Sequence, residues 1–350
     1  MASVTIYDVA ARAGVSIKTV SRVMNNEPNV RPAMRERVLT AAGDLGYSPN
    51  LSARSLAGSR SFVIAVFVDA ALTIDHWQSE RGADYLSRIQ LGATLECRAA
   101  GYHLLIELID HEGPQVRQEV AALLAALKPD GVILTPPSSD NEVVLELLEK
   151  AGTPYVRVGP ERTSGQGPRV HMDDVAAARE MTEHLADLGH KRIGFIVGEP
   201  RYGASQARRE GYLEAMKTRG LPVADGLVRQ GDFTFQSGLE QAKALLALPD
   251  RPTAIFASND DMALGCIAAV AEAGLMIPGD ISVAGFDDSP SSRFSRPQLT
   301  TVRQPVAEMS SVAAKLLIAQ AKSNEPPERP IDELLPFELI HRASTAPPPR

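Results

Sequence analysis

A chain of 350 residues is too long for one small domain and long enough to bury substantial hydrophobic cores. Its formal net charge is −7, from 36 Lys and Arg against 43 Asp and Glu. No apolar run reaches the length of a membrane span, and the two cysteines, Cys97 and Cys266, fit core thiols of a reducing compartment. The N-terminus shows no secretory leader, so we expect a cytoplasmic protein with no membrane contact.

The charge is distributed unevenly along the chain. Residues 1–60 hold eight Lys and Arg against four Asp and Glu, a net charge of +4, which leaves −11 on residues 61–350. A cationic N-terminal segment on an anionic body is typical of a protein that binds a polyanion with that segment. Without this charge asymmetry, the two short helices that this segment predicts could equally well be a pair of surface helices with solvated charges.

The N-terminal segment predicts two short helices joined by a tight turn. Thr5 and Asp8 form a variant of the capping box at the start of the first helix. Gly14 fits the turn of a helix-turn-helix, where a β-carbon would hinder the bend. Ser16 is a good N-cap for a second helix over Ile17–Met24.

This second helix has an apolar face and a face suited to DNA. Val20 and Val23 point inward, together with Val15 from the turn. A second helix of this kind inserts its N-terminal side chains into the major groove. Arg22 could then bind guanine O6 and N7 bidentately, while Lys18 could reach guanine or phosphate. In the same groove, Ile17 could pack on a thymine methyl group.

A third helix is expected between Pro32 at its first position and Gly46 just beyond its end. Its apolar face consists of Met34, Val38, Leu39 and Leu45. Residues 50–58 have helical spacing but are too few to form a stable helix alone, so their ordering needs DNA or a partner chain. We assign residues 1–49 to a helix-turn-helix DNA-binding domain and residues 50–60 to a hinge helix and linker.

The strings VTIYDVAARAGVSIKTVSRVMN and GYSPNLSARSLAGSRS resemble the lactose/galactose-repressor (LacI/GalR) family. In that family the hinge helix folds on the operator, and a leucine from each subunit wedges between central base steps of the minor groove. The resemblance places this wedge at Leu56, although the same leucine could simply pack on the body. The DNA-binding candidates are Thr5, Ser16, Ile17, Lys18, Thr19, Ser21, Arg22, Asn25, Asn50, Ala53 and Leu56.

Strand and helix patterns alternate along the rest of the chain. Strands are expected at 62–68, 103–109, 131–135, 155–159, 192–198, 227–232, 254–258 and 282–287. Amphipathic helices are expected near 80–100, 115–127, 140–151, 174–188, 203–219, 236–247, 260–273 and 305–321. Such alternation predicts parallel sheets with right-handed crossovers, here in two subdomains with a cleft between them. Ligands of open α/β sheets bind at the carboxyl ends of the strands.

The expected fold is therefore an N-terminal all-α helix-turn-helix domain followed by an α/β body. The strings LADLGHKRIGFIVG, ASNDDMALG, DISVAGFDD and LTTVRQP extend the resemblance. They imply a two-subdomain effector-binding and dimerisation domain over 61–342, like a type I periplasmic binding protein, with crossovers near 160, 290–305 and 325. The tail, 343–350, is expected to be disordered. It lacks the leucine heptads of a tetramerising helix, so we expect a homodimer.

Several polar side chains follow strand ends, where the cleft is expected. Asp69 is a candidate effector contact on this ground alone. The resemblance implies that five further residues contact the effector or tie the subdomains together: Arg208, Phe233, Asn259, Asp287 and Gln304. Carboxylate, amide and guanidinium groups can bracket sugar hydroxyls, and an aromatic face can pack on a sugar ring. Asn259 could instead act only as a helix cap.

The chain departs from the family pattern after the fourth strand. The family often has an Asp-Arg pair there, but the Asp is missing, and Glu161 or Arg162 could take its place. Trp77, the only tryptophan, could stack on a sugar or cover the core. These differences leave the identity of the effector open.

No residue pattern in the sequence requires catalysis. His103, His171, His184 and His190 lack paired metal-ligand spacing, and no nucleophile elbow, phosphate loop or dinucleotide fingerprint is present. We expect no cofactor, no metal and no enzyme activity. The leading hypothesis is a transcriptional regulator, most often a repressor in this family, that binds pseudo-palindromic double-stranded operator DNA under control of a sugar effector. A transport protein would need a secretory leader and no DNA-binding head, and a sugar-acting enzyme would need a catalytic set.

Overall fold

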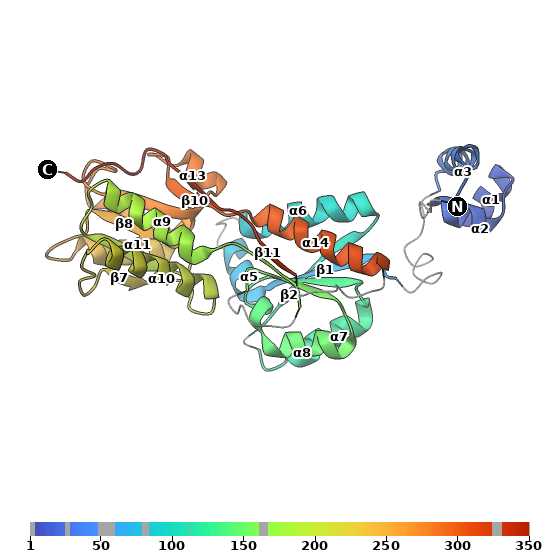
Figure 1. Cartoon of the computed structure of the whole chain (residues 1–350), viewed down its shortest axis with the longest axis horizontal. Coiled ribbons are helices and arrows are strands. Elements are labelled where there is room, and N and C mark those ends of the chain that lie inside the picture. The colour runs from blue at the N-terminus through green and yellow to red at the C-terminus, as the bar shows by residue number, and fades with distance from the viewer. Residues whose placement is uncertain are drawn as a thin grey trace. The chain divides into compact units, whose positions relative to one another are not determined.

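The computed structural model describes residues 4–24, 29–47, 60–78, 84–111, 113–160, 167–323 and 331–349. The chain divides into two compact units, Met1–Phe62 and Val63–Arg350, and each is described by itself (Figure 1). Some residues that the sequence singles out lie outside the described ranges. These are Asn25, Asn50, Ala53, Leu56, Glu161 and Arg162.

The N-terminal unit is built from three helices around a small core. The helices are α1 (Ile6–Ala13), α2 (Ile17–Met24) and α3 (Pro32–Leu45). Val9, Val20 and Val38, one from each helix, are fully or almost fully buried at its centre. The Thr5 N–H and hydroxyl donate to the Asp8 carboxylate at 2.8 and 2.7 Å, which fixes the start of α1. The expected helix-turn-helix fold is confirmed.

The prediction is wrong for one residue of the apolar face of α3. Leu39 is 51% exposed, whereas Ala41 and Ala42 are buried in the core. The buried residues follow Val38 at i+3 and i+4, and position 39 lies about 100° around the helix from that stripe.

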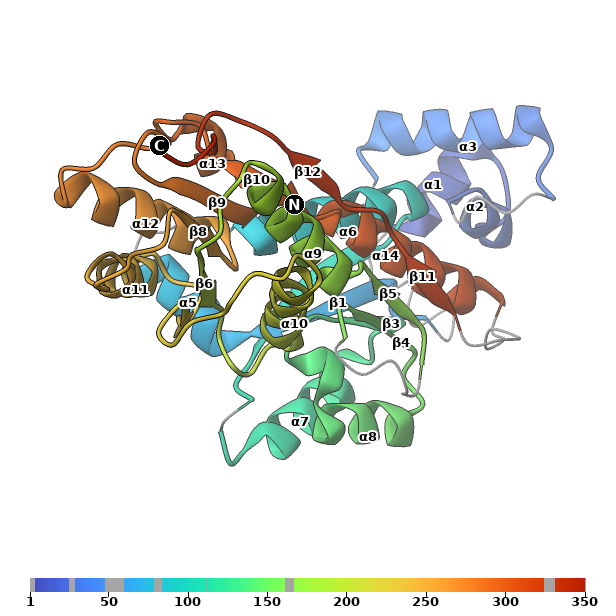
Figure 2. The same cartoon turned by 60° about the vertical axis from the view of Figure 1, so that its left-hand side comes forward.

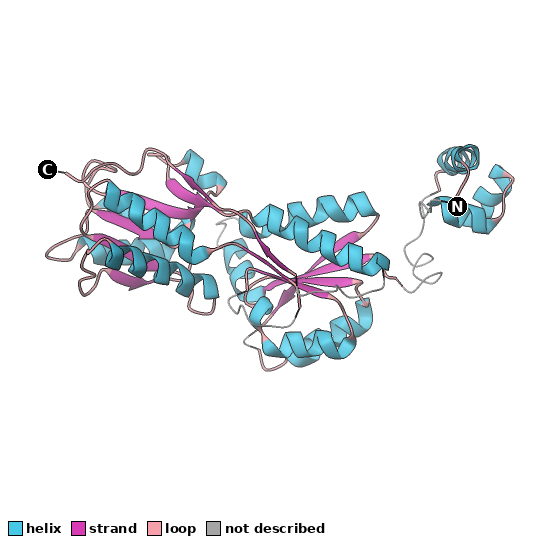
Figure 3. Cartoon of the chain, viewed as in Figure 1, coloured by secondary structure: helices cyan, strands magenta, loops and turns pink. Residues whose placement is uncertain are grey.

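The body contains two six-stranded sheets (Figure 3). The first has the order β11-β5-β4-β3-β1-β2 and is parallel throughout. Its strands are β1 (Val63–Asp69), β2 (His103–Ile109), β3 (Gly131–Leu134), β4 (Tyr155–Val158), β5 (Arg169–His171) and β11 (Asp332–Leu334). The inner strands are buried apolar runs, as expected for strands that are covered on both faces.

The second sheet has the order β12-β10-β9-β8-β6-β7. Its strands are β6 (Ile193–Val197), β7 (Val228–Gln230), β8 (Ala254–Ala257), β9 (Ser282–Asp287), β10 (Thr300–Arg303) and β12 (Glu338–Ile340). Only the β10–β12 pairing is antiparallel; the others are parallel. The two-subdomain α/β fold expected from the sequence is confirmed.

Helices cover both faces of each sheet (Figures 1 and 2). The first sheet is flanked by α5 (Ala70–Gln78), α6 (Asp84–Ala100), α7 (Val116–Leu127), α8 (Glu142–Ala151) and α14 (Val306–Ser323). The second is flanked by α9 (Asp174–Asp187), α10 (Gly203–Thr218), α11 (Phe235–Leu246), α12 (Asp260–Glu272) and the short α13 (Pro290–Phe294). α6 packs on α14 so closely that a β-carbon at Gly92 would lie 1.9 Å from Ala307 O.

The chain passes between the sheets three times, and two of these passages differ from expectation. It leaves β5 at His171 and enters α9 at Asp174, and it passes from β11 to β12 at 335–337. Both passages lie beyond the expected positions near 160 and 325. The cause is that β5 and β11, short strands on the outer side of the first sheet, precede them and were not predicted. The passage at Gln304, between β10 and α14, falls in the expected range.

The missed elements are short or polar. β11 has the sequence DEL, and all three of its residues are exposed, so it lacks the apolar signal of a buried strand. β5 and β12, also missed, have three residues each, and the missed β10 has four. α5 was missed too, and its Trp77 is 78% exposed, so this side chain does not cover the core. The missed strands form because they hydrogen-bond to a neighbouring strand, and not because their own sequence favours a strand.

The expected disordered tail at 343–350 is wrong for the residues before its prolines. Ser344 is fully buried; its hydroxyl donates to Val283 O at 2.6 Å and accepts the Thr300 N–H at 2.8 Å. His190 Nε2 lies 2.9 Å from Ala346 O. The tail therefore packs on the second sheet, because its backbone and hydroxyl groups complete hydrogen bonds that β9 and β10 leave open.

Among the residues that the structure describes, no helix is long and apolar enough to cross a membrane. Within the same ranges, no group of three or more His, Cys, Asp or Glu side chains is arranged to hold a metal ion. Cys97 and Cys266 are both buried and free, as predicted.

The histidines beneath the tail make the stability of the body depend on pH. Burial lowers the pKa of His184 to about 4, and the nearby His341 ring, 4.5 Å away between centroids, adds to this effect. An unfolded histidine titrates near 6.5, so between pH 6.5 and 4 the unfolded chain binds a proton here that the folded chain does not. Stability should therefore fall as pH drops through this window.

The measurement is urea unfolding at pH 7.5 and pH 5. His184→Gln should lose less stability between these two values than the wild-type protein does. His103→Gln, at an exposed position of β2, is the matched control and should behave like wild type. An identical pH dependence for His184→Gln and wild type would contradict this account.

Candidate functional site

The face predicted to contact DNA lies on α2 of the N-terminal unit. Ser16 Oγ accepts the Thr19 N–H at 3.1 Å, so the predicted N-cap is present. Ile17, Lys18 and Arg22 are exposed, while the opposite side of the helix is buried in the core. Three side chains suited to base and phosphate contacts therefore share the solvent face, as a recognition helix requires.

The other described DNA-binding candidates have structural partners. Thr5 begins α1 through its bonds to Asp8, and the Thr19 and Ser16 hydroxyls lie 2.9 Å apart. Ser21 is half-buried on α2. Thr5 and Ser16 are nevertheless exposed, whereas Thr19 and Ser21 are half-buried.

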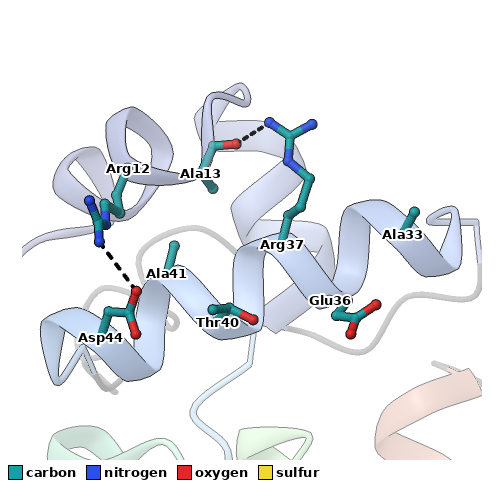
Figure 4. A pocket seen from close by; sticks show the side chains of 8 residues that line it. All are labelled: Arg12, Ala13, Ala33, Glu36, Arg37, Thr40, Ala41 and Asp44. Atoms are coloured by element: carbon teal, nitrogen blue, oxygen red, sulfur yellow. Dashed lines mark hydrogen bonds and ion pairs between the residues drawn. The ribbon is translucent and has the colours of Figure 1, made fainter.

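A groove separates α1 from α3 and is lined by charged side chains (Figure 4). Arg37 Nη2 donates to Ala13 O at 2.5 Å, and Arg12 Nη2 lies 3.4 Å from the Asp44 carboxylate. A cation at the C-terminal end of α1 stabilises carbonyls that lack helical partners. These two arginines therefore join the helices of the unit.

In the body, a cavity of about 530 Å³ lies among the carboxyl ends of both sheets. This volume is in the usual range for a small-molecule site. Five of the six effector candidates line it: Arg208, Phe233, Asn259, Asp287 and Gln304. Asp69 is not among the lining residues. The first sheet contributes Tyr85 and Leu86 from α6, with Pro136 and Gly159 beyond β3 and β4.

Arg208, on α10, is held rigidly at the edge of the cavity. Its Nε donates to Asp174 Oδ1 at 2.8 Å and its Nη1 to Ser258 O at 2.6 Å. The guanidinium also lies 3.7 Å from the ring centroid of Phe286, a cation–π distance. The residue is only 4% exposed, so its position is fixed before any ligand arrives.

Asp287 ends β9 with its carboxylate at the cavity. Its backbone φ of 128° is unusual for a residue other than glycine, and Asp288 follows with a φ of 53°. The Gln304 amide donates to Asp287 Oδ1. Burial raises the pKa of Asp287 to about 6, although Arg208 and the Gln304 bond favour the ionised form. This carboxylate is therefore positioned to accept hydrogen bonds from a ligand.

Sequence reasoning missed the residues that hold this strained corner. Asp288 is 1% exposed and accepts bonds from Arg293 at 2.9 Å, Arg303 at 2.8 Å and Arg342. Arg293 and Arg303 lie 5 and 15 residues after Asp288, and Arg342 lies 54 residues after it, so no regular spacing in the sequence marks the cluster.

Arg88, on α6, reaches the same corner from the first sheet. Its Nη1 donates to Asp287 O at 2.8 Å and its Nη2 to Asp288 O at 2.6 Å. Its guanidinium also pairs with Asp84, one turn earlier, at 2.8 Å. One arginine thus binds both carbonyls of the strained corner across the gap between the sheets.

A second buried carboxylate, Asp260, supports the corner from behind. It accepts bonds from the Ser289 N–H at 2.7 Å and from the Thr301 hydroxyl at 2.6 Å. Burial raises its pKa well above the ordinary value, and the neighbouring Asp287 acts in the same direction. The sequence string ASNDDMALG contains this residue, but its spacing did not distinguish it from a first-turn helix carboxylate.

Phe233 and Asn259 form another wall of the cavity. Phe233 has a φ of 68°, and its carbonyl accepts the Asn259 Nδ2–H at 2.9 Å. Asn259 Oδ1 in turn accepts the Met262 N–H at 2.9 Å and caps α12. The capping role of Asn259 is therefore real, and the same bonds hold Phe233 at the cavity. Tyr202 packs edge-on against Phe233, with ring centroids 5.7 Å apart.

Asp69 acts between the sheets, outside the cavity lining. It ends β1, is 3% exposed, and accepts the Tyr202 hydroxyl at 2.6 Å. Arg201 Nη2 lies 3.6 Å from the same carboxylate. Because Tyr202 and Arg201 precede α10, these bonds connect the first sheet to the second.

Comparison with known proteins identifies the family. The model "Bacterial regulatory proteins, lacI family" matches residues 5–50, and "Periplasmic binding protein-like domain" matches residues 182–345. Catabolite control protein A of Priestia megaterium is 36% identical over 321 residues, 90% of this chain and 92% of that protein. The chain belongs to the LacI family. The transcriptional repressor CytR of Escherichia coli (strain K12) is 32% identical over 341 residues, covering 97% and 96%.

Solved structures of LacI-family proteins have the same fold. A complex of the transcriptional regulator CelR with cellobiose is 30% identical, with a TM-score of 0.72, covering 97% of this chain and 99% of that one. A Lac repressor dimer bound to operator and the anti-inducer ONPF is 28% identical, with a TM-score of 0.79, covering 99% and 100%. This LacI-family chain is therefore a DNA-binding transcriptional regulator, as the sequence predicted.

The Arg88 bridge can be tested by its removal. Arg88→Met keeps most of the aliphatic bulk but leaves two carbonyls and Asp84 without this donor, which should destabilise the body by about 1–3 kcal/mol. The measurement is urea unfolding at pH 7.5. The matched control is Arg98→Met, at an exposed position of the same helix, which should change stability by less than about 0.5 kcal/mol. Equal effects of the two substitutions would mean that the bridge carries no stability.

Proposed function

We propose that this LacI-family protein is a dimeric transcriptional repressor whose operator affinity is set by a small sugar bound in the body cavity. The observation that carries the proposal is the convergence of Arg208, Asp287 and Gln304 with an aromatic ring, Phe233, on one cavity. Charged and amide groups can bracket adjacent hydroxyls while the ring packs on C–H groups. Related regulators are described in complex with cellobiose and with ribose, which supports this class of ligand.

The sugar acts by preferring one arrangement of the two subdomains. Residues of both sheets line the cavity, so a bound ligand contacts groups whose separation changes when the sheets move. An effector shifts such an equilibrium only through its differential affinity for the two states. The hinge candidates Asn50, Ala53 and Leu56 would carry this shift to the operator.

The DNA-binding form is a homodimer that acts in the cytoplasm on nucleoid DNA. A two-fold dimer presents two recognition helices, so the operator is a pseudo-palindrome of two half-sites. The Lac repressor structure, a dimer bound to operator, supports this arrangement. In each half-site, Ile17, Lys18 and Arg22 select the bases, with Thr5, Ser16, Thr19, Ser21 and Asn25 around them.

The proposal is tested by selection from random duplex DNA with the purified full-length protein, repeated with cellobiose, ribose and other mono- and disaccharides. We expect one enriched palindrome whose recovery changes at least tenfold with one sugar. Enrichment that no sugar alters would contradict sugar control but leave DNA recognition intact. The absence of any enriched sequence, with or without sugars, would contradict both parts of the proposal.

Direct base contact by α2 makes a second prediction. Arg22→Ala should weaken binding to the selected operator by about 1–3 kcal/mol, roughly 5- to 150-fold, and relax the base preference at one position of each half-site. Arg31→Ala, which removes an exposed arginine just before α3, is the matched control and should leave the base preference unchanged. Fluorescence anisotropy on operator and scrambled duplexes measures both. Equal loss on the two duplexes for Arg22→Ala would show that Arg22 contacts only phosphate.

A further inference from the structure

Acidic side chains outnumber basic ones among the residues that line the cavity. Four carboxylates line it: Asp84, Asp174, Asp261 and Asp287. Among the lining residues that the structure describes, Arg208 is the only Lys or Arg. The lining therefore has a formal charge of −3, which repels an anionic ligand, and the repulsion is strengthened because part of the site is shielded from water.

Nearby arginines do not reverse this charge. Arg88 pairs with Asp84 at 2.8 Å and Arg208 with Asp174 at 2.8 Å, so counting both arginines still leaves −2. Two stretches that adjoin lining residues in the sequence, 79–83 and 161–166, each contain one Glu and one Arg and add no net charge.

The three lining side chains that carry amide or guanidinium groups each donate to a partner within the protein. The Arg208 guanidinium donates to Asp174 and to Ser258 O. The Asn259 amide donates to Phe233 O, and the Gln304 amide donates to Asp287.

The Tyr202 hydroxyl, also at the cavity, donates to Asp69. The lining is thus rich in acceptors, and it suits a ligand that donates hydrogen bonds. Sugar hydroxyls and ammonium groups donate, whereas ionised phosphate and carboxylate groups only accept.

We infer that the effector carries no anionic group: the cavity takes a neutral sugar or an amino sugar and rejects sugar phosphates and uronates. This inference rests on the proposed sugar effector and narrows its chemical class. Charge and hydrogen-bond polarity act in the same direction, because carboxylates both repel an anion and offer it no donor.

The experiment is equilibrium dialysis of the full-length protein at pH 7.5 against an extract of small metabolites, with mass spectrometry of the retained molecules. Matched sets are then titrated: glucose, glucosamine, glucose 6-phosphate and glucuronate; ribose and ribose 5-phosphate; cellobiose and cellobionate. We expect neutral or aminated sugars to be retained, and the anionic member of any bound set to bind at least 30-fold more weakly.

The outcomes separate the two proposals. Tight retention of a sugar phosphate or uronate would overturn the charge inference and leave the sugar proposal standing. Retention of a neutral molecule that is not a sugar would contradict the sugar proposal and agree with the exclusion of anions.

A variant tests whether the acidic lining causes the exclusion. Asp84→Asn removes one lining charge and leaves the Arg88 cation in place. The ratio of the dissociation constant of the anionic sugar to that of its neutral counterpart should therefore fall at least threefold. Asp261→Asn serves the same purpose if Asp84→Asn does not fold. Asp225→Asn, at an exposed position away from the cavity lining, is the matched control and should leave this ratio of dissociation constants as in the wild-type protein. If the ratio does not change in the lining variants, the acidic lining is not the cause of the weaker binding of anionic sugars.

Discussion

The effector cavity depends on one buried carboxylate, Asp288, and the three guanidinium groups around it. Burial opposes its ionisation, but hydrogen bonds from Arg342, Arg293 and Arg303 outweigh that effect and hold its pKa at about 2. Such a buried charge would be costly without partners. With them, it fixes α13, β10 and the segment after β12 to the end of β9. The adjacent Asp287 is thereby kept in a strained conformation with its carboxylate at the cavity.

The same corner is also where the two sheets are joined. Arg88 from α6 holds the carbonyls of Asp287 and Asp288, and Gln304, just before α14, holds the Asp287 carboxylate. α6 and α14 are themselves packed tightly, since Gly92 meets Ala307 and the Ser310 hydroxyl donates to Ile89 O at 2.9 Å. A ligand that binds Asp287 therefore acts on a residue that two helices of the first subdomain hold directly.

Sequence reasoning succeeded where the determinant is local. Caps, turn glycines and apolar periodicity gave α1 to α3 and every strand of five or more residues, and strand ends located Asp287 and Asn259. It failed where the determinant is tertiary. β5 and β11 are strands only because a neighbour pairs with them, and the tail is ordered because Ser344 bonds to β9 and β10. Asp69 was located correctly at a strand end, yet its partner, Tyr202, lies far along the chain and gives it a different role.

The contacts that span the sheets matter more for regulation than the contacts within one of them. An effector that touched only Arg208 and Asn259, both fixed within the second subdomain, would bind equally well in every arrangement of the sheets and would regulate nothing. Asp69 with Tyr202, and Arg88 with the Asp287 corner, are bonds whose geometry changes when the sheets move. An effector that stabilises or strains these bonds shifts the equilibrium between arrangements. Effector control of operator affinity thus requires the ligand to contact groups of both subdomains, or to engage Asp287 or Tyr202, where the cavity lining meets the connections between the sheets.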